Sequence, residues 1–190
     1  MKQEPKNRNG MKSKEAIRKT FLELMKKKKT EQITVSEIVK KADLNRSTFY
    51  AHYDDVFDIV NEIQGDVIDE LHHIVNHFDI NQTTSKDLVV IDEVSSYLAK
   101  NKETFQICIN TQDVLPFLED LIDIFTDALL KNQSMRKINE LEDIKKTKIA
   151  FIAGGIVFSY IKWFRNKIDI TLDDLTIIVK DQISKSLINE

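Results

Sequence analysis

The sequence contains very few residues that break helices. Of its 190 residues, four are Gly and two are Pro, which together make about 3% of the chain against roughly 12% in average proteins. This scarcity argues against hairpin-rich β folds, collagen-like sequence and low-complexity disorder. Hydrophobic residues make up 42% and charged residues 31%, a balance that suits a globular protein with a core. We therefore expect an all-α protein.

Cysteine and long apolar runs are also scarce. Cys108 is the single cysteine, which excludes an internal disulfide, is compatible with a reducing compartment and favours a small core residue. The first twenty residues are polar and basic, unlike a signal peptide. The longest apolar stretch, residues 149–161, is shorter than the ~20 residues that cross a bilayer. We expect a cytoplasmic protein.

The small net charge of −3 hides an asymmetry along the chain. Residues 1–55 contain 14 basic and 8 acidic residues, a net charge of +6, so residues 56–190 carry −9. A basic segment joined to an acidic body is typical of a protein that meets a polyanion at one end. The alternative is the ordinary variation of charge along any chain.

Helical spacing of apolar residues dominates the sequence. Residues 1–10, with Pro5 and a terminal Gly10, predict a disordered basic arm, followed by a helix from Ser13 into Lys26–Lys29. Further helices are expected over residues 34–42, 46–52, 55–78, 86–100, 102–110, 113 or 115 to 130, 146–166 and 171–187. Thr171 is the expected N-cap of the last helix.

The segment from Thr34 to Tyr53 is the most informative. Thr34 and Glu37 match a capping box at the start of one short helix, and Asn45 is a good N-cap for the next. Residues 43–45 form the turn between them. Two short helices joined by such a turn match a helix-turn-helix, whose second helix lies in the DNA major groove. The alternative is an ordinary helical hairpin.

The run ITVSEIVKKADLNRSTFYAHYDDVFDIV closely resembles the DNA-binding domain of TetR-family transcriptional regulators. The matching positions are Thr34, Val35, Ile38, Val39, Ala42, Leu44, Thr48, Tyr50 and Tyr53. The close resemblance covers residues 12–65. It implies about nine helices, a helix-turn-helix DNA-binding domain over residues 11–55, and a helical effector-binding and dimerisation domain over residues 56–190.

The sequence departs from the family pattern at two positions and in one short stretch. Asp43 stands where the family often has Gly, although Asp tolerates left-handed backbone better than most residues. Val56, preceded by two aspartates, stands where the family usually has a phosphate-binding Lys. Lys26–Lys29 fill a stretch where the family tends to have Gly, and we hypothesise that one or two of them replace the missing charge.

The resemblance also implies a set of DNA-contacting residues. Arg46, Ser47 and Thr48 would lie nearest the base edges, where Arg can grip guanine bidentately. Tyr53 is expected in the core, because it replaces an apolar aromatic residue of the family. The expected DNA contacts are Lys28, Lys29, Thr34, Ser36, Asn45, Arg46, Ser47, Thr48, Tyr50 and His52.

Residues 149–164 are apolar nearly all round, as in a helix that is buried on both sides. In the resembled family this helix and the last one pair with their copies in a homodimer, and Gly154 with Gly155 would let another backbone approach. The alternative is the central helix of a monomeric bundle. The expected interface is Phe151, Ile152, Gly155, Ile156, Tyr160, Trp163, Leu175, Ile178, Val179 and Ile183.

The family senses small molecules in the second domain. Each candidate for the pocket can equally be an ordinary core residue, and the scarcity of charge on the apolar faces favours an apolar or aromatic effector. The candidates are Phe78, Tyr97, Phe105, Cys108, Phe117, Phe125 and Phe158.

His73 and His77 lie four residues apart, one turn after Asp69, a spacing that can hold a transition metal. No second strong ligand pair accompanies them, so we expect a solvated or pocket-facing stripe, with no metal and no cofactor.

These features favour a homodimeric, sequence-specific repressor that binds near-palindromic double-stranded DNA and is released by a small-molecule effector. The alternative is a non-enzymatic co-activator or architectural partner on the same scaffold. The sequence shows no nucleophile–base constellation and no phosphate-binding Gly loop, so an enzyme is not expected.

Overall fold

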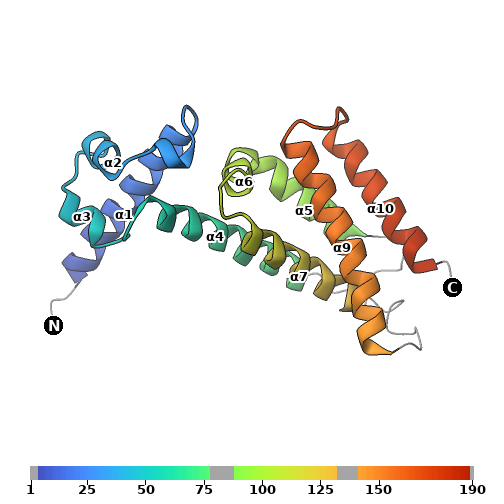
Figure 1. Cartoon of the computed structure of the whole chain (residues 1–190). Helices are drawn as coiled ribbons and strands as arrows, with labels where there is room; N and C mark the ends of the chain where they lie inside the picture. Colours follow the sequence, from blue (N-terminus) through green and yellow to red (C-terminus); the bar gives the residue numbers. More distant parts are fainter. Residues whose placement is uncertain (1–3, 78–87, 132–140, 189–190) are drawn as a thin grey trace. The chain divides into compact units, whose positions relative to one another are not determined.

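A computed structural model describes residues 4–77, 88–131 and 141–188 of the chain. These residues form nine α-helices and one 3₁₀ helix, with no strand among them (Figure 1), which confirms the all-α prediction. The elements are α1 (Glu4–Met25), η1 (Thr30–Gln32), α2 (Val35–Lys41), α3 (Arg46–Tyr50), α4 (Val56–His77), α5 (Val89–Lys100), α6 (Lys102–Ile109), α7 (Leu115–Lys131), α9 (Glu142–Phe164) and α10 (Leu172–Ile188).

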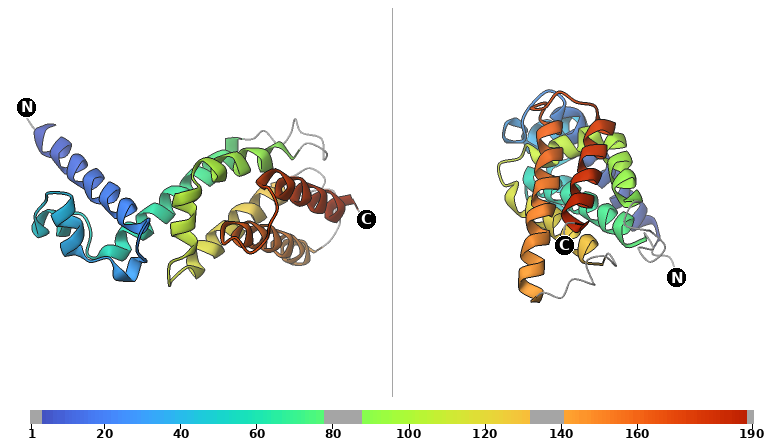
Figure 2. Two further views of the ribbon diagram at one scale, coloured as in Figure 1. Left: turned by 90° about the horizontal axis from the view of Figure 1, so that it is seen from above. Right: turned by 90° about the vertical axis from the view of Figure 1, so that its right-hand side faces the viewer.

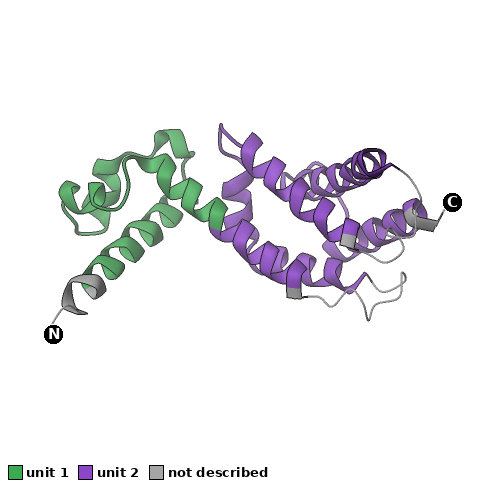
Figure 3. Ribbon diagram, turned by 90° about the horizontal axis from the view of Figure 1, so that it is seen from below, with its two compact units in different colours: residues 1–65 green, residues 66–190 purple. Residues whose placement is uncertain are grey.

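The chain divides into two compact units, Met1–Gly65 and Asp66–Glu190 (Figure 3). The division falls inside α4, ten residues after the expected border between residues 55 and 56. The first half of α4 belongs with unit 1, because the Glu62 carboxylate forms ion pairs with Lys14 and Arg18 of α1.

Unit 1 is held together by a small core to which each of its first three helices contributes. Ile17 and Phe21 of α1, Ile38 of α2 and Phe49 of α3 are all fully buried. Burying a side chain of this size stabilises a fold by roughly 1.5–3 kcal/mol. The helical spacing in the sequence therefore identified the faces that meet.

Helix α1 begins much earlier than expected. It starts at Glu4, so the prediction of a disordered arm is wrong from Glu4 to Gly10, and residues 1–3 lie outside the described residues. Pro5 falls in the first turn, where its missing N–H has no helical partner to lose. Gly10 continues the helix without a positive φ, and its carbonyl accepts a hydrogen bond of 2.9 Å from Ser13 Oγ.

Two predicted helix starts have the expected cap. Thr34 Oγ1 accepts a hydrogen bond of 3.2 Å from the Glu37 amide at the start of α2. Thr171 Oγ1 accepts one of 3.0 Å from the Asp174 amide at the start of α10, and Asp174 Oδ2 accepts one in return from the Thr171 hydroxyl. Each such cap contributes about 1 kcal/mol.

Unit 2 is a bundle of longer helices. α9 and α10 form an antiparallel pair, α5 lies beside α10, and α7 packs along α9 (Figures 1 and 2). The expected helix starting at residue 86 begins at Val89 among the described residues, and the one expected from residue 146 begins at Glu142.

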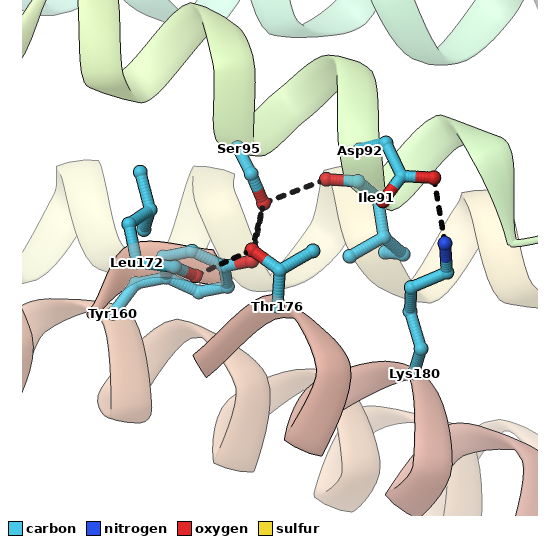
Figure 4. A network of polar contacts seen from close by, with 7 residues as sticks. All are labelled: Ile91, Asp92, Ser95, Tyr160, Leu172, Thr176 and Lys180. Atoms are coloured by element: carbon cyan, nitrogen blue, oxygen red, sulfur yellow. Dashed lines mark hydrogen bonds and ion pairs between the residues drawn. The ribbon is translucent and has the colours of Figure 1, made fainter. Parts of the chain in front are cut away.

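Three hydroxyl groups meet inside this bundle (Figure 4). Ser95 Oγ of α5 donates to the Ile91 carbonyl at 2.7 Å and lies 2.7 Å from Tyr160 Oη of α9. Thr176 Oγ1 of α10 lies 2.9 Å from Ser95 Oγ and 2.7 Å from the Leu172 carbonyl. Burial raises the pKa of Tyr160 above its usual value. The network joins three helices that are far apart in the sequence.

α9 is the one described helix that is long and apolar enough to cross a membrane. Its 23 residues exceed the thirteen-residue stretch on which the sequence-based expectation rested. This is weak evidence for a membrane span, since core helices of soluble proteins pass the same test. Here Ile149, Ala153 and Phe164 of α9 are buried in unit 2.

Candidate nucleic-acid interface

α2 and α3 form the two short helices expected for a helix-turn-helix. The turn between them contains Asp43 with φ of 53°, a left-handed backbone conformation that Asp adopts more readily than most residues. The prediction that Asp43 can replace the usual glycine is therefore confirmed. Ile38 of α2 and Phe49 of α3 are both fully buried, and the two helices contact each other.

α3 presents polar side chains to solvent. Arg46 and Ser47 are exposed, Thr48 is half-buried, and Tyr50 is 54% exposed. Asn45 occupies the N-cap position, but its side chain makes no capping hydrogen bond. The exposed face of α3 therefore carries the residue types that read base edges and phosphates.

Arg46 and Ser36 are brought together by the fold. Arg46 Nη2 donates a short hydrogen bond to Ser36 Oγ, linking the first residue of α3 to the first turn of α2. Both side chains are exposed. The sequence placed the two residues in one candidate site but gave no sign of this contact, because they lie ten positions apart.

The two candidate lysines before α2 have different surroundings. Lys28 Nζ lies 2.7 Å from Glu37 Oε1, an exposed ion pair. Glu37 was expected to complete the capping box, and its carboxylate pairs with this lysine. Lys29 is exposed, and its backbone amide donates to Gln32 Oε1 at 3.2 Å. The positive charge of Lys28 is thus already balanced within unit 1.

His52 connects the end of the helix-turn-helix to α1. Its Nε2 lies 2.8 Å from Ser13 Oγ, a contact across 39 positions that sequence reasoning missed. A methyl group on Gly10 would stand 3.9 Å from the His52 ring, which is ordinary van der Waals contact. His52 was predicted to contact DNA, and in the structure it also helps to hold α1.

Glu62 of α4 makes a second set of contacts within unit 1 that the sequence did not reveal. Lys14 and Arg18 of α1 pair with its carboxylate, Arg18 Nη1 at 2.9 Å, and Tyr53 Oη donates to it at 3.2 Å. Burial raises the pKa of Glu62, but the Lys14 hydrogen bond and charge, with those of Tyr53 and Arg18, outweigh burial and leave the pKa below its usual value. Tyr53 is 4% exposed, which confirms its predicted place in the core.

The start of α4 is acidic. Asp55 Oδ1 accepts hydrogen bonds from the amides of Phe57 and Asp58, at 2.7 and 3.1 Å, and so caps the helix. Asp58 Oδ2 accepts one of 2.7 Å from the Asp54 amide. Val56, where the family has Lys, is 7% exposed and belongs to the core. This helix start offers carboxylates in place of a phosphate-binding cation.

The effector-pocket candidates fall into two groups. Phe105, Cys108, Phe117 and Phe125 are buried, and Phe105 lies 5.9 Å from Phe117 between ring centroids. Phe158 is 58% exposed, because it lies on the outer face of α9, so its assignment to a pocket is wrong.

Tyr97 is half-buried, and burial raises its pKa, with Glu70 acting in the same direction. Phe78 lies outside the described residues. The pocket itself stays a prediction.

The dimer candidates also divide. Five of them are buried inside the protomer, because α9 and α10 turn these faces toward each other and toward the rest of unit 2: Ile156, Tyr160, Leu175, Val179 and Ile183. For these five the prediction of an outward-facing surface is wrong. Ile152 and Trp163 are half-buried, and Trp163 Nε1 donates to the Ile170 carbonyl at 2.9 Å.

Two remaining candidates, Phe151 and Gly155, form an exposed stripe on α9 together with the former pocket candidate Phe158. Phe151 is 84% exposed, Gly155 is exposed, and Phe158 follows three residues later. On α10, Ile178 is 48% exposed and Ile177, which the sequence analysis did not select, is 65% exposed. A Cβ built on Gly154 or Gly155 would meet nothing within 4 Å, so no other helix within residues 4–77, 88–131 and 141–188 closely approaches them.

The histidine pair gives no further indication of a metal. Among the described residues no group of three or more His, Cys, Asp or Glu side chains could hold an ion. His73 and Asp69 are exposed on α4, and the side chain of His77 lies outside the described residues.

No family model matches the sequence, and no curated protein matches it either. Solved structures do. A protein from Syntrophomonas wolfei assigned to the TetR-family transcriptional regulators superimposes with a TM-score of 0.72 over 94% of this chain and 96% of its own, at 14% identity.

NalD, the secondary repressor of the MexAB-OprM multidrug efflux pump in Pseudomonas aeruginosa, gives 0.66 over 96% and 99%, at 16% identity. The dihydroxyacetone kinase operon activator DhaS gives 0.58 over 92% and 96%, at 21% identity. The resemblance of one sequence segment thus extends to the architecture of nearly the whole chain, and the protein has the fold of TetR-family transcriptional regulators.

Proposed function

We propose that this protein is a non-enzymatic, cytoplasmic member of the TetR family that binds double-stranded DNA sequence-specifically through α2 and α3. The observation that carries the proposal is the exposed polar face of α3, with Arg46, Ser47 and Tyr50 directed outward from a helix-turn-helix whose buried side is fully packed. Side chains of this kind read base edges and phosphates in the major groove.

The charge of the chain supports this placement. The net charge of +6 on residues 1–55 attracts a polyanion, and the −9 on the remainder repels it. The basic segment, residues 1–55, also contains the helix-turn-helix. Long-range attraction would therefore bring the DNA to the end of the protein that reads it.

We further propose that the protein works as a homodimer. The apolar stripe of Phe151, Gly155 and Phe158 on α9 is supported by Ile177 and Ile178 on α10, all exposed in the single chain. Large apolar side chains exposed in a row mark an interaction surface. A symmetric pair of helix-turn-helix units would read a near-palindrome with half-sites one helical turn, ~34 Å, apart.

The third element of the proposal is release from DNA by a small apolar or aromatic molecule bound in unit 2. Its candidate contacts are the buried aromatic residues Phe105, Phe117 and Phe125 with Tyr97. A ligand that binds one conformation of the dimer more tightly shifts the population toward it. Release of this kind would make the protein a ligand-responsive repressor.

The test is selection of binding sites from a random-sequence duplex library by the purified full-length protein. We expect enrichment of a near-palindrome whose affinity falls steeply with salt. Arg46→Ala should cost ~1–3 kcal/mol at one base pair of each half-site and leave the others unchanged. Failure to enrich any sequence at low salt would contradict the proposal.

One observation favours a second candidate function. The acidic start of α4, with Asp54 and Asp55 beside the buried Val56, weakens phosphate binding on this scaffold. The neighbour DhaS is an operon activator. A co-activator or architectural partner on the same scaffold would bind another protein and show no sequence-specific DNA affinity in the same selection.

A further inference from the structure

The hydrogen bond between Arg46 and Ser36 bears on how a base pair would be read. Arg46 Nη2 of α3 donates to Ser36 Oγ of α2. Both side chains are exposed, so the contact is part of the surface that would face DNA.

We propose that Ser36 is a positioning residue for Arg46, and that it sets the sequence preference at a base pair that it does not itself contact. This inference rests on the proposed function. In it, the Ser36 oxygen holds the guanidinium plane in the orientation that a base edge requires.

The donor inventory of Arg46 allows both contacts at once. A guanidinium group carries five N–H donors in a rigid planar fork. One donor goes to Ser36, and four remain, enough to pair with the N7 and O6 acceptors of guanine. Bidentate pairing needs a defined plane, and a side chain that is already oriented loses less freedom on binding.

The Ser36 oxygen is itself held in place by the fold. Ser36 lies in the first turn of α2, two residues after the N-cap Thr34. α2 and α3 pack against each other, with a left-handed turn at Asp43 between them and with Ile38 and Phe49 both fully buried. Two rigid helices therefore define where the hydrogen bond places the Arg46 side chain.

Direct contact with DNA would give Ser36 a different energetic signature. A serine that donates to a phosphate supports binding to every sequence equally, because phosphates carry no sequence information. A serine that orients Arg46 affects only the base pair that Arg46 reads. The two roles can therefore be separated by measuring preference at each position of the site.

The experiment uses the purified full-length protein and the duplex enriched from the random library. Relative affinities are measured for every single-base-pair variant of that duplex, with wild type, Ser36→Ala, Ser36→Thr, Arg46→Ala and the double variant Ser36→Ala/Arg46→Ala. Ser96→Ala, an exposed serine of α5, is the matched control and should leave every preference unchanged.

We expect Arg46→Ala to reduce the preference at one base pair by about 5- to 150-fold. Ser36→Ala should reduce the preference at the same base pair by about 2- to 10-fold. Ser36→Thr keeps the hydroxyl and should restore most of it. The double variant should match Arg46→Ala, because Ser36 has nothing left to orient.

Two results would overturn the inference while leaving the proposed function intact. Ser36→Ala could weaken binding to all sequences equally and add to Arg46→Ala, which would make Ser36 a phosphate contact. It could also leave every preference unchanged. If the wild-type protein enriches no sequence, the proposed function fails first, and this inference fails with it.

Discussion

The two units of the molecule differ in the polarity of the side chains that they expose. On unit 1 the outward side chains around the helix-turn-helix are polar and contact one another, as in the pairs Arg46–Ser36 and Lys28–Glu37. On unit 2 the buried side is polar as well as apolar, with the hydroxyl network around Ser95, while Phe151 stands exposed outside. A polar surface suits a polyanion, and an apolar one suits another protein surface.

The difference shows why apolar periodicity alone misplaced part of the candidate sites. In unit 1 the apolar faces of the first three helices meet in one small core, although Met11 and Phe57 stay exposed. In unit 2 helix α9 is apolar on several sides, and the sequence cannot say which side faces inward. Five of ten expected interface residues are therefore core residues of the protomer.

The largest expected effect that tests this difference comes from removing one phenylalanine from each unit. Phe49→Ala deletes a fully buried side chain and should reduce the free energy of unfolding by about 3–5 kcal/mol. Phe151→Ala deletes an 84% exposed one and should change the stability of the single chain by less than about 0.5 kcal/mol. Urea denaturation of both variants, followed by circular dichroism, measures the two values.

The same pair also tests the proposed dimer. Phe151→Ala should make the unfolding midpoint independent of protein concentration and shift sedimentation toward the monomer, since linked association stabilises the folded state by mass action. If Phe151→Ala leaves a concentration-dependent midpoint as it was, the α9 stripe is not the interface.

The next effect concerns the buried hydroxyls of unit 2. The Ile91 carbonyl can only accept, so the single Ser95 hydroxyl proton goes to it and the Tyr160 hydroxyl donates to Ser95 Oγ. Ser95→Ala leaves the buried Tyr160 hydroxyl without this partner and should cost about 1–3 kcal/mol. Tyr160→Phe removes the hydroxyl that needs a partner and should cost less. Equal losses in thermal denaturation would contradict this account of the network.

A smaller effect follows from Glu62 in unit 1. Because its pKa is lowered in the folded state, its ionised form contributes stability above its unfolded pKa of about 4.3, and this is lost as the pH falls through the folded pKa. Glu62→Gln should therefore destabilise unit 1 by about 1 kcal/mol at neutral pH. Below the folded pKa wild type and variant should converge in urea denaturation. A difference that persists at acid pH would mean that packing rather than charge is responsible.

The parts of the fold that could be predicted are those encoded locally. The caps at Thr34 and Thr171 and the left-handed Asp43 follow from residue type and position alone. The contacts of Glu62 with Lys14 and of His52 with Ser13 could not, because they join positions about 40 or more apart whose meeting depends on how helices pack. The prediction of a disordered arm is wrong because neither Pro5 nor Gly10 interrupts the helix, which continues through both residues.

Glycines in the two units offer a further contrast, at the level of tenths of a kcal/mol. Gly65 lies inside α4 and is exposed, and a Cβ there would meet nothing within 4 Å. Gly65→Ala should stabilise the protein by about 0.5–1 kcal/mol through helix propensity.

Gly155 has the same open space around a built Cβ in the single chain, but it lies on the proposed interface. A gain in thermal stability for Gly65→Ala together with weaker self-association for Gly155→Ala would distinguish a free glycine from one that a partner helix approaches.

The smallest expected effect distinguishes the two lysines before α2. The charge of Lys28 is balanced by Glu37 at 2.7 Å, whereas the side chain of Lys29 is exposed. A lysine that neutralises a phosphate releases a counterion, so Lys29→Gln should reduce the salt slope of DNA affinity by about 0.9. Lys28→Gln should reduce the slope by less, because Glu37 already competes with the phosphate for the charge of Lys28. The double variant Lys28→Gln/Glu37→Gln should have nearly the slope of wild type.

Fluorescence anisotropy of a labelled duplex across a salt series measures all three slopes, with Lys100→Gln at the end of α5 as the control. Equal reductions for the two lysines would show that the ion pair opens on DNA, in which case the polar contacts on the surface of unit 1 are exchanged on binding rather than kept.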